Sequence, residues 1–98
     1  MKYLLLEKEI GEPSAEAFHV HLEAEARHVW KLVQEGIVRE TYFNSDQHTA
    51  VLMLECASRE EVEKHKAGFP LVKAGLIDFE IIPLQPYDGF ARLFKSEV

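Results

Sequence analysis

Apolar side chains recur with helical spacing between Phe18 and Gly36 of this 98-residue chain. Ser14 precedes the pattern as a suitable N-cap, and Gly36 follows it as a typical C-terminal residue. At 3.6 residues per turn, one stripe collects six apolar positions: Phe18, Leu22, Ala26, Val29, Leu32 and Val33. The pattern predicts one amphipathic helix that starts after Ser14 and runs to about Glu35.

Four segments have the alternating or β-rich patterns that are typical of strands, namely residues 2–10, 37–43, 49–56 and 76–84. Ser58 and Glu61 have the spacing of a capping box, so a second helix is predicted to follow Ser58 and run to about Lys66. The residues between Gly68 and Gly75 are expected to be irregular. Pro83 predicts that the last strand lies at a sheet edge.

The predicted order is strand, helix, strand, strand, helix, strand (βαββαβ). This is the split βαβ or ferredoxin-like arrangement, an α+β fold with a four-stranded antiparallel sheet. Right-handed crossovers place both helices on one face of the sheet. Because residues 49–56 are apolar on both faces, we predict that a second copy of the chain covers the other face, sheet against sheet. The tail from residue 85 to 98 is expected to pack on this domain or on a neighbour, because it contains several large apolar groups: Tyr87, Phe90, Leu93 and Phe94.

Composition limits the class of protein. With 47% hydrophobic residues, residues 1–98 are expected to form a single domain. The formal net charge of -6 argues against nucleic acid and against an anionic membrane surface as partners. Cys56 is the single cysteine, so no intramolecular disulfide can form, and it is interpreted as a small buried hydrophobe. The run Leu4-Leu5-Leu6 is too short for a membrane span, and a cytoplasmic location is expected.

Glu25 lies inside the apolar stripe of the first predicted helix. A carboxylate against apolar surface is costly unless it is paired, hydrogen-bonded, protonated or facing a cavity. Arg39, on the following strand, is a candidate to share a pocket with it. Glu25 would then be a base with a raised pKa, and Arg39 would stabilise an enolate oxygen. The alternative is a buried ion pair that only fixes how helix and sheet dock.

Two histidines flank Glu25 on the same helix, His21 and His28. Their spacing raises the possibility of a metal site, but the chain has no HExxH motif and no cysteine pair, so no metal is expected. We instead expect His21 to orient Glu25 and His28 to lie at the rim of a pocket. Tyr42 and Phe79 are candidates to line that pocket, the alternative being core or interface packing. The two histidines interpreted as surface residues of a turn and a helix are His48 and His65.

The spacing of Phe18, Glu25, Gly36 and Arg39, followed by Phe69-Pro70-Leu71 and the strand at residues 79–84, resembles the muconolactone isomerase-related branch of the dimeric α/β barrels. Residues 72–76 are also similar to the corresponding part of the neighbouring YCII-related family. The chain departs from muconolactone isomerases where they have a histidine near the position of Glu40 and an aromatic residue near Val38.

The resemblance implies a homodimer or higher homo-oligomer, with one pocket per subunit between the helices and the sheet. It also implies proton transfer within an unsaturated lactone or related enolisable compound, without a cofactor, and the matching positions are Glu25 and Arg39. A non-catalytic small-molecule-binding or assembly module is the main alternative. Oxygenase chemistry, cofactor-free or haem-dependent, is suggested only by analogy of fold.

Overall fold

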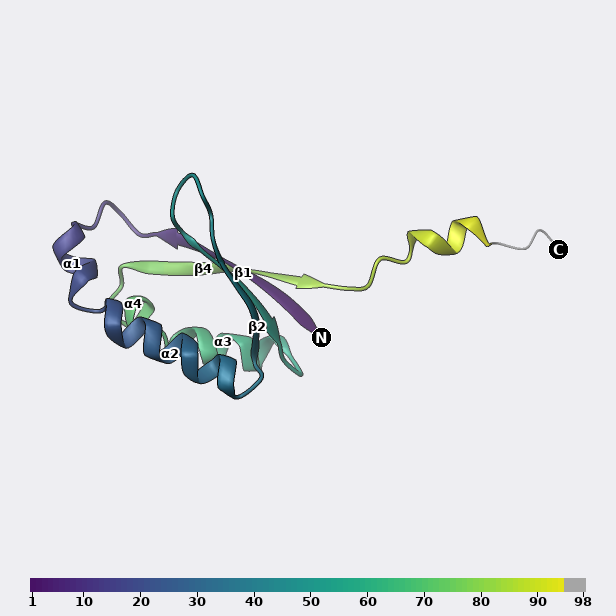
Figure 1. The fold of residues 1–98 in the computed structure, drawn as a ribbon, viewed down its shortest axis with the longest axis horizontal. Coiled ribbons are helices and arrows are strands. Elements are labelled where there is room, and N and C mark those ends of the chain that lie inside the picture. Colours follow the sequence, from purple (N-terminus) through teal and green to yellow (C-terminus); the bar gives the residue numbers. More distant parts are fainter. Residues whose placement is uncertain (95–98) are drawn as a thin grey trace.

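A four-stranded antiparallel sheet with helices on one face forms the body of the protein in the computed structural model, which describes residues 1–94 (Figure 1). The strand order is β2-β3-β1-β4. The strands are β1 (Lys2–Glu9), β2 (Val38–Phe43), β3 (Ala50–Glu55) and β4 (Ile77–Leu84). The helices are α1 (Ala15–His19), α2 (Leu22–Gln34), α3 (Arg59–Ala67), α4 (Pro70–Lys73) and the 3-10 helix η1 (Gly89–Leu93). The predicted ferredoxin-like α+β fold is therefore confirmed. None of the helices among the described residues is long and apolar enough to cross a bilayer.

The strands pair with the register expected of this topology. β1 lies in the centre, where Leu5 is opposite Leu52 of β3 on one side and Ile81 of β4 on the other. Pro83 lies on β4, which is an edge strand as predicted. The pairing of β2 with β3 shifts between Val38 and Glu40, which indicates a β-bulge at that point.

The first helical region is interrupted, which corrects the prediction of one continuous helix. Ser14 caps α1 as expected, because its Oγ accepts a hydrogen bond from Ala17 N at 3.1 Å. The helix then stops at His19, His21 N donates to Phe18 O, and α2 begins at Leu22. Histidine and valine are weak helix formers, and the break falls in the His-Val-His stretch that contains them.

The second helical region is confirmed at its start and extended at its end. Ser58 Oγ accepts from Glu61 N at 3.3 Å, so α3 is capped as the sequence predicts. The segment expected to be irregular contains α4, a single turn with Pro70 at its first position. Phe69, the residue before α4, provides no side-chain cap for it.

The core lies between the helices and one face of the sheet. Its largest fully buried side chains are Phe69, Leu5, Leu54, Ile77 and Val62. On α2 only Leu32 is buried, while Leu22 and Val33 of the same apolar stripe stay exposed. The helix therefore does not rest on the sheet along its whole length.

The opposite face of the sheet is uncovered within residues 1–94, since α2, α3 and α4 lie together on the other side (Figure 1). Strand register places five half-buried apolar side chains on this open face: Leu4, Leu6, Val51, Met53 and Ile82. The expectation of an apolar second face is confirmed, whereas its cover by a second copy stays a prediction.

The segment after β4 leaves the domain as an arm (Figure 1), and the principal extents of the molecule are 64 × 29 × 20 Å. The large apolar side chains of the arm are 64–81% exposed: Tyr87, Phe90, Leu93 and Phe94. The arm thus does not pack on its own domain, and packing on a neighbour stays a prediction. Residues 95–98 of the predicted tail lie outside the described residues.

Candidate functional site

A cavity of about 970 Å³ lies between α1 and α2 on one side and the sheet on the other. It occupies the region where the apolar stripe of α2 is not in contact with the strands. Most of its wall is apolar, with side chains such as Phe18, Val29, Trp30, Phe69 and Phe79. Small-molecule sites are typically apolar hollows with a few placed polar groups, so this cavity is the candidate site.

Glu25 lines the cavity, as the sequence analysis predicts. Its Oε1 accepts a hydrogen bond from Leu71 N at 3.0 Å. Leu71 is the second residue of α4, where a backbone N–H has no partner within the helix, so Glu25 caps this helix from a different element. Burial raises the pKa of Glu25, although the hydrogen bond from Leu71 opposes that effect.

Glu7 is a second carboxyl group in the cavity, one that the sequence analysis did not select. Its Oε1 accepts from Ala50 N at 3.1 Å, and burial again raises the pKa. The negative charge of Glu7 also raises the pKa of Glu25, so the two acids are close enough to interact. Period-two alternation from the buried Tyr3 and Leu5 puts Glu7 on the core face of β1, and this signal was available from the sequence.

The β2–β3 hairpin supplies further polar groups of the wall. Thr41, Tyr42 and His48 all line the cavity. His48, interpreted from the sequence as a surface turn residue, is exposed and stacks on Phe43 with ring centroids 4.1 Å apart. The Tyr42 hydroxyl donates to Glu40 Oε1 at 2.8 Å, and this hydrogen bond raises the pKa of Tyr42.

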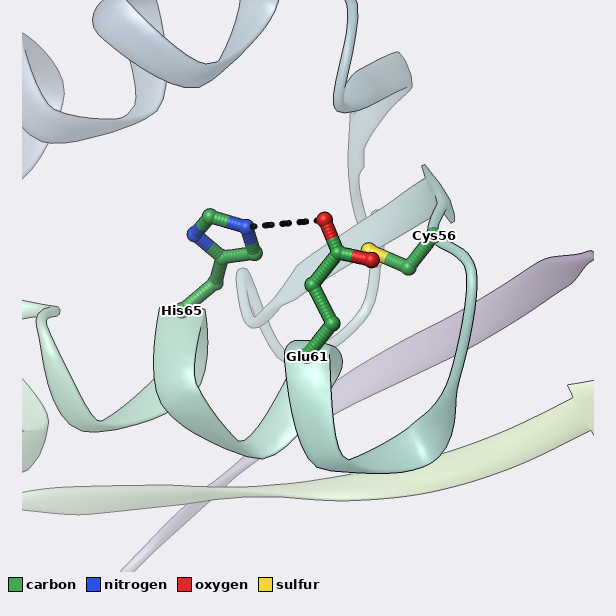
Figure 2. A group of neighbouring side chains, drawn as sticks. All are labelled: Cys56, Glu61 and His65. Carbon is green, nitrogen blue, oxygen red and sulfur yellow. Dashed lines mark ion pairs between the residues drawn. The ribbon is translucent and has the colours of Figure 1, made fainter.

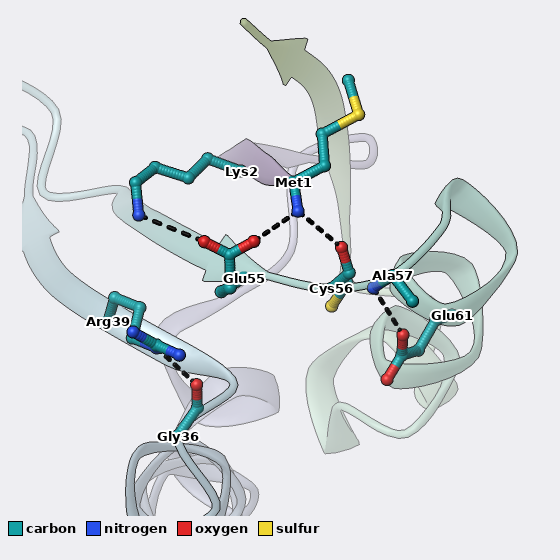
Figure 3. Close-up of polar contacts among 8 residues, drawn as sticks. All are labelled: Met1, Lys2, Gly36, Arg39, Glu55, Cys56, Ala57 and Glu61. Carbon is teal, nitrogen blue, oxygen red and sulfur yellow. Dashed lines mark hydrogen bonds and ion pairs between the residues drawn. The ribbon is translucent and has the colours of Figure 1, made fainter. Parts of the chain in front are cut away.

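Several predicted site residues lie elsewhere. Arg39 is exposed and not part of the cavity wall, and its Nε donates to the Gly36 carbonyl (Figure 3). His21 precedes α2 without a side-chain capping bond and does not line the cavity. His28 also lies outside the wall: its ring meets Phe69 edge-on at 4.6 Å, and its buried Nε2 has no hydrogen-bond partner among the described residues. Burial lowers the pKa of His28.

The structure thus brings together three of the six predicted residues, Glu25, Tyr42 and Phe79, in one cavity wall. It does not bring Arg39 to Glu25, which was the expected pair. The catalytic and binding roles assigned to these residues stay predictions.

Cys56 is buried, as expected, at the end of β3. Burial raises the pKa of its thiol, with a further contribution from Glu61, so the thiol stays protonated near neutral pH. His65 is half-buried rather than exposed, which corrects its interpretation as a surface residue.

The polar wall is suited to proton transfer. Two carboxyl groups with raised pKa values lie in an apolar hollow, and each has one oxygen bound to a backbone N–H. A carboxyl whose pKa is raised toward neutrality is a better general base and acid than an exposed one. The Thr41 hydroxyl and the His48 imidazole can donate to an oxygen that becomes negative during a reaction, whereas the Tyr42 hydroxyl already donates to Glu40.

The comparisons with known proteins support the fold. No protein-family model matches the chain, and no curated protein matches it by sequence. Among solved structures, the chain is similar to 5-chloro-2-hydroxyhydroquinone dehydrochlorinase (TftG) from Burkholderia phenoliruptrix AC1100, in complex with 2,5-dihydroxybenzoquinone. The TM-score is 0.63 and the identity 19%, over 87% of this chain and 94% of the other. At this identity the likeness shows the fold alone, and it agrees with the ferredoxin-like arrangement that the sequence predicts.

Proposed function

We propose that this protein is a small-molecule enzyme that moves a proton within a neutral unsaturated lactone or a related enolisable compound, without a cofactor. The observation that carries the proposal is the pair of carboxyl groups, Glu7 and Glu25, in an apolar cavity of about 970 Å³. Burial raises the pKa values of both carboxyl groups above their ordinary value, which makes each a stronger base than an exposed carboxylate.

Glu25 is the proton carrier in this proposal. Its Oε1 is bound to Leu71 N, so Oε2 is the oxygen that takes the proton. Removal of a proton from the carbon between the double bond and the carbonyl leaves a dienolate, and return of that proton at the far carbon completes the isomerisation. Glu7, whose pKa burial also raises, is a second group next to the same space that can carry a proton.

The enolate oxygen is stabilised by donors of the β2–β3 hairpin. Arg39 was predicted for this role but does not line the cavity, whereas Thr41, Tyr42 and His48 do. Hydrogen-bond donors that are already oriented toward the developing charge stabilise it without reorganisation during the reaction. The hairpin therefore takes the role first assigned to the arginine.

The charge of the wall selects a neutral substrate. Three carboxyl groups line the cavity, those of Glu7, Glu9 and Glu25, and no lysine or arginine is among the lining residues of the described chain. A substrate with its own carboxylate would be repelled. The similar solved protein is named a dehydrochlorinase and is in complex with 2,5-dihydroxybenzoquinone. That supports a ligand of this size in the fold.

The test uses α-angelica lactone, a neutral β,γ-unsaturated lactone, in D₂O. Conversion to the conjugated isomer and deuterium uptake are followed by NMR. Glu25→Gln keeps the acceptor for Leu71 N but cannot take a proton, so the rate should fall by at least about 100-fold. Glu23→Gln, at an exposed position on the same helix, is the matched control and should keep the wild-type rate. A Glu25→Gln variant as active as wild type would remove Glu25 from the mechanism.

A non-catalytic binding module is the second candidate. Both carboxyl groups cap backbone N–H groups, which is a structural task, and the remaining wall is largely apolar. This alternative predicts that the lactone binds without exchange or isomerisation, and that Glu25→Gln binds it equally well.

We also infer that two chains pair through the open sheet face. Leu4 lies at its centre, opposite Met53 on one side and Ile82 on the other. A charge at the centre of a pairing face is costly, so Leu4→Glu should give a folded monomer in light scattering. Gln34→Glu on the exposed end of α2 is the control and should leave the mass unchanged. Wild-type protein that is monomeric at all concentrations would refute the pairing.

A further inference from the structure

We propose that Cys56, Glu61 and His65 form a binding site for a zinc-class divalent cation, separate from the cavity. One atom from each side chain, a thiol sulfur, a carboxylate oxygen and an imidazole nitrogen, lies within 4.8 Å of the other two (Figure 2). None of the three residues lines the cavity between α2 and the sheet.

Local folding gathers these side chains. Cys56 directly follows β3, and the capped start of α3 brings the chain back beside it within five residues. Glu61 and His65 are four residues apart on α3, so they lie on the same helix face. Figure 2 shows the Glu61 carboxylate between the imidazole and the thiol. The sequence carries this spacing, but it gives no sign that Cys56 faces the same side.

The distances between the three ligand atoms are close to those around a tetrahedrally coordinated zinc ion. Zinc bonds of about 2.0 Å to nitrogen and oxygen and 2.3 Å to sulfur put neighbouring ligand atoms roughly 3.3–3.6 Å apart. His65 Nε2 lies 3.9 Å from Glu61 Oε1, which is too long for a hydrogen bond but requires little movement to share an ion. Rotation of the half-buried Glu61 and His65 side chains closes the remaining gap.

Glu61 is already oriented by its surroundings. Its Oε2 accepts from Ala57 N at 2.8 Å (Figure 3), which leaves Oε1 free to face His65. Second contacts of this kind fix the ligands of metal sites and tune their affinity. The Glu61 side chain is 39% exposed, so water can reach the group and supply a fourth ligand.

The ligand types select the class of cation. The Cys56 thiol loses its proton when an ion binds, and a thiolate with an imidazole suits zinc and neighbouring transition metals, whereas magnesium and calcium prefer oxygen ligands alone. Two cations near this end of the molecule already have acidic partners. The Met1 ammonium contacts Glu55 as well as the Cys56 carbonyl (Figure 3), and Lys66 pairs with Asp78 at 3.1 Å. A bound ion would tie the end of β3 to α3.

The test is a titration of the chelator-treated protein with Co²⁺, a spectroscopic probe for zinc sites, followed by competition with Zn²⁺. Wild type should bind one Co²⁺ per chain, with a near-ultraviolet sulfur-to-cobalt band and visible bands typical of tetrahedral coordination. Zn²⁺ should abolish these bands. Cys56→Ser should lose the sulfur band, and His65→Gln should weaken binding by at least about tenfold, since even outer contacts contribute that much.

Two controls keep the result specific. His19→Gln removes an exposed histidine of α1 and should leave the titration unchanged. Glu61→Gln keeps an acceptor for Ala57 N, so it should fold normally, as judged by circular dichroism, while binding the ion more weakly. A wild-type titration without the sulfur band, or equal binding by wild type and His65→Gln, would overturn the proposal.

Discussion

The hydrogen bond between Glu25 and Leu71 N gives a stability prediction that separates the carboxylate's structural role from its chemical one. Glu25→Ala removes the acceptor and leaves a donor on a residue whose side chain is 4% exposed. Glu25→Gln replaces one acceptor oxygen with another. We therefore expect the alanine variant to be clearly less stable than the glutamine variant.

The expected loss of stability in Glu25→Ala follows from the Leu71 N–H, which is left without an acceptor. A buried donor without an acceptor costs about 1–3 kcal/mol. Phe69 offers no capping side chain, so no neighbouring side chain of the described residues at the start of α4 replaces the lost oxygen. For a domain of this size, each kcal/mol lowers the melting temperature by about 4–8 °C. Glu25→Gln should lie near or above wild type at neutral pH, since it also removes a partly buried charge.

Urea denaturation followed by circular dichroism measures both variants, and amide hydrogen exchange reports directly on Leu71 N. Glu23→Ala is the matched control: its side chain is 88% exposed and pairs with Arg27 at 2.8 Å on the same helix. An exposed pair of this kind contributes only about 0.3–0.5 kcal/mol. Equal stability of the alanine and glutamine variants, or unchanged protection of the Leu71 amide in Glu25→Ala, would refute the reasoning.

Three further predictions concern the fold. Phe69→Ala should cost roughly 3–5 kcal/mol in chemical denaturation, because the ring is fully buried against Phe79, and a loss under about 1 kcal/mol would contradict its central place in the core. Gly75→Ala should cost about 1–2 kcal/mol by the same assay, because φ is +75° there, and a neutral result would contradict that conformation. Burial raises the folded-state pKa of Glu7 above its ordinary value of 4.5. Above pH 4.5 the folded state therefore binds more protons than the unfolded state. The stability of the wild type then falls as the pH rises through the folded-state pKa. Glu7→Gln should flatten this fall in a urea series across pH, and an identical pH profile would count against the burial of its charge.

The fold could be predicted because its signals are local. Ser14 and Ser58 mark helix starts with the side-chain bonds that the sequence suggests, and the alternation of β4 correctly assigns its buried face to Ile77, Phe79 and Ile81. The helix break was missed because the apolar stripe continues across it. The apolar stripe shows which side chains face the same way, but it does not show whether the backbone is continuous. Phe18 and Leu22 line one cavity although they belong to separate helices.

The site could be predicted only in part, for reasons of backbone geometry. Alternation put Arg39 on the same face as Thr41 and Phe43, but the bulge between Val38 and Glu40 interrupts that register. Thr41 and Phe43 reach the cavity, whereas Arg39 does not. A bulge leaves no clear sign in one sequence. Glu25 was found because a charge inside an apolar stripe is costly, which is an energetic signal that a bulge does not affect.

The separation of α2 from the sheet has a consequence for how the protein responds to its ligand. The volume that a fully packed core would fill with leucine and valine side chains remains open beneath this helix, where only Leu32 is buried. A compound bound in the cavity takes the place of the missing core side chains. Its binding free energy then adds to the free energy of unfolding of the whole domain. A shift of the melting temperature across a library of neutral ring compounds is therefore a direct way to find the natural occupant.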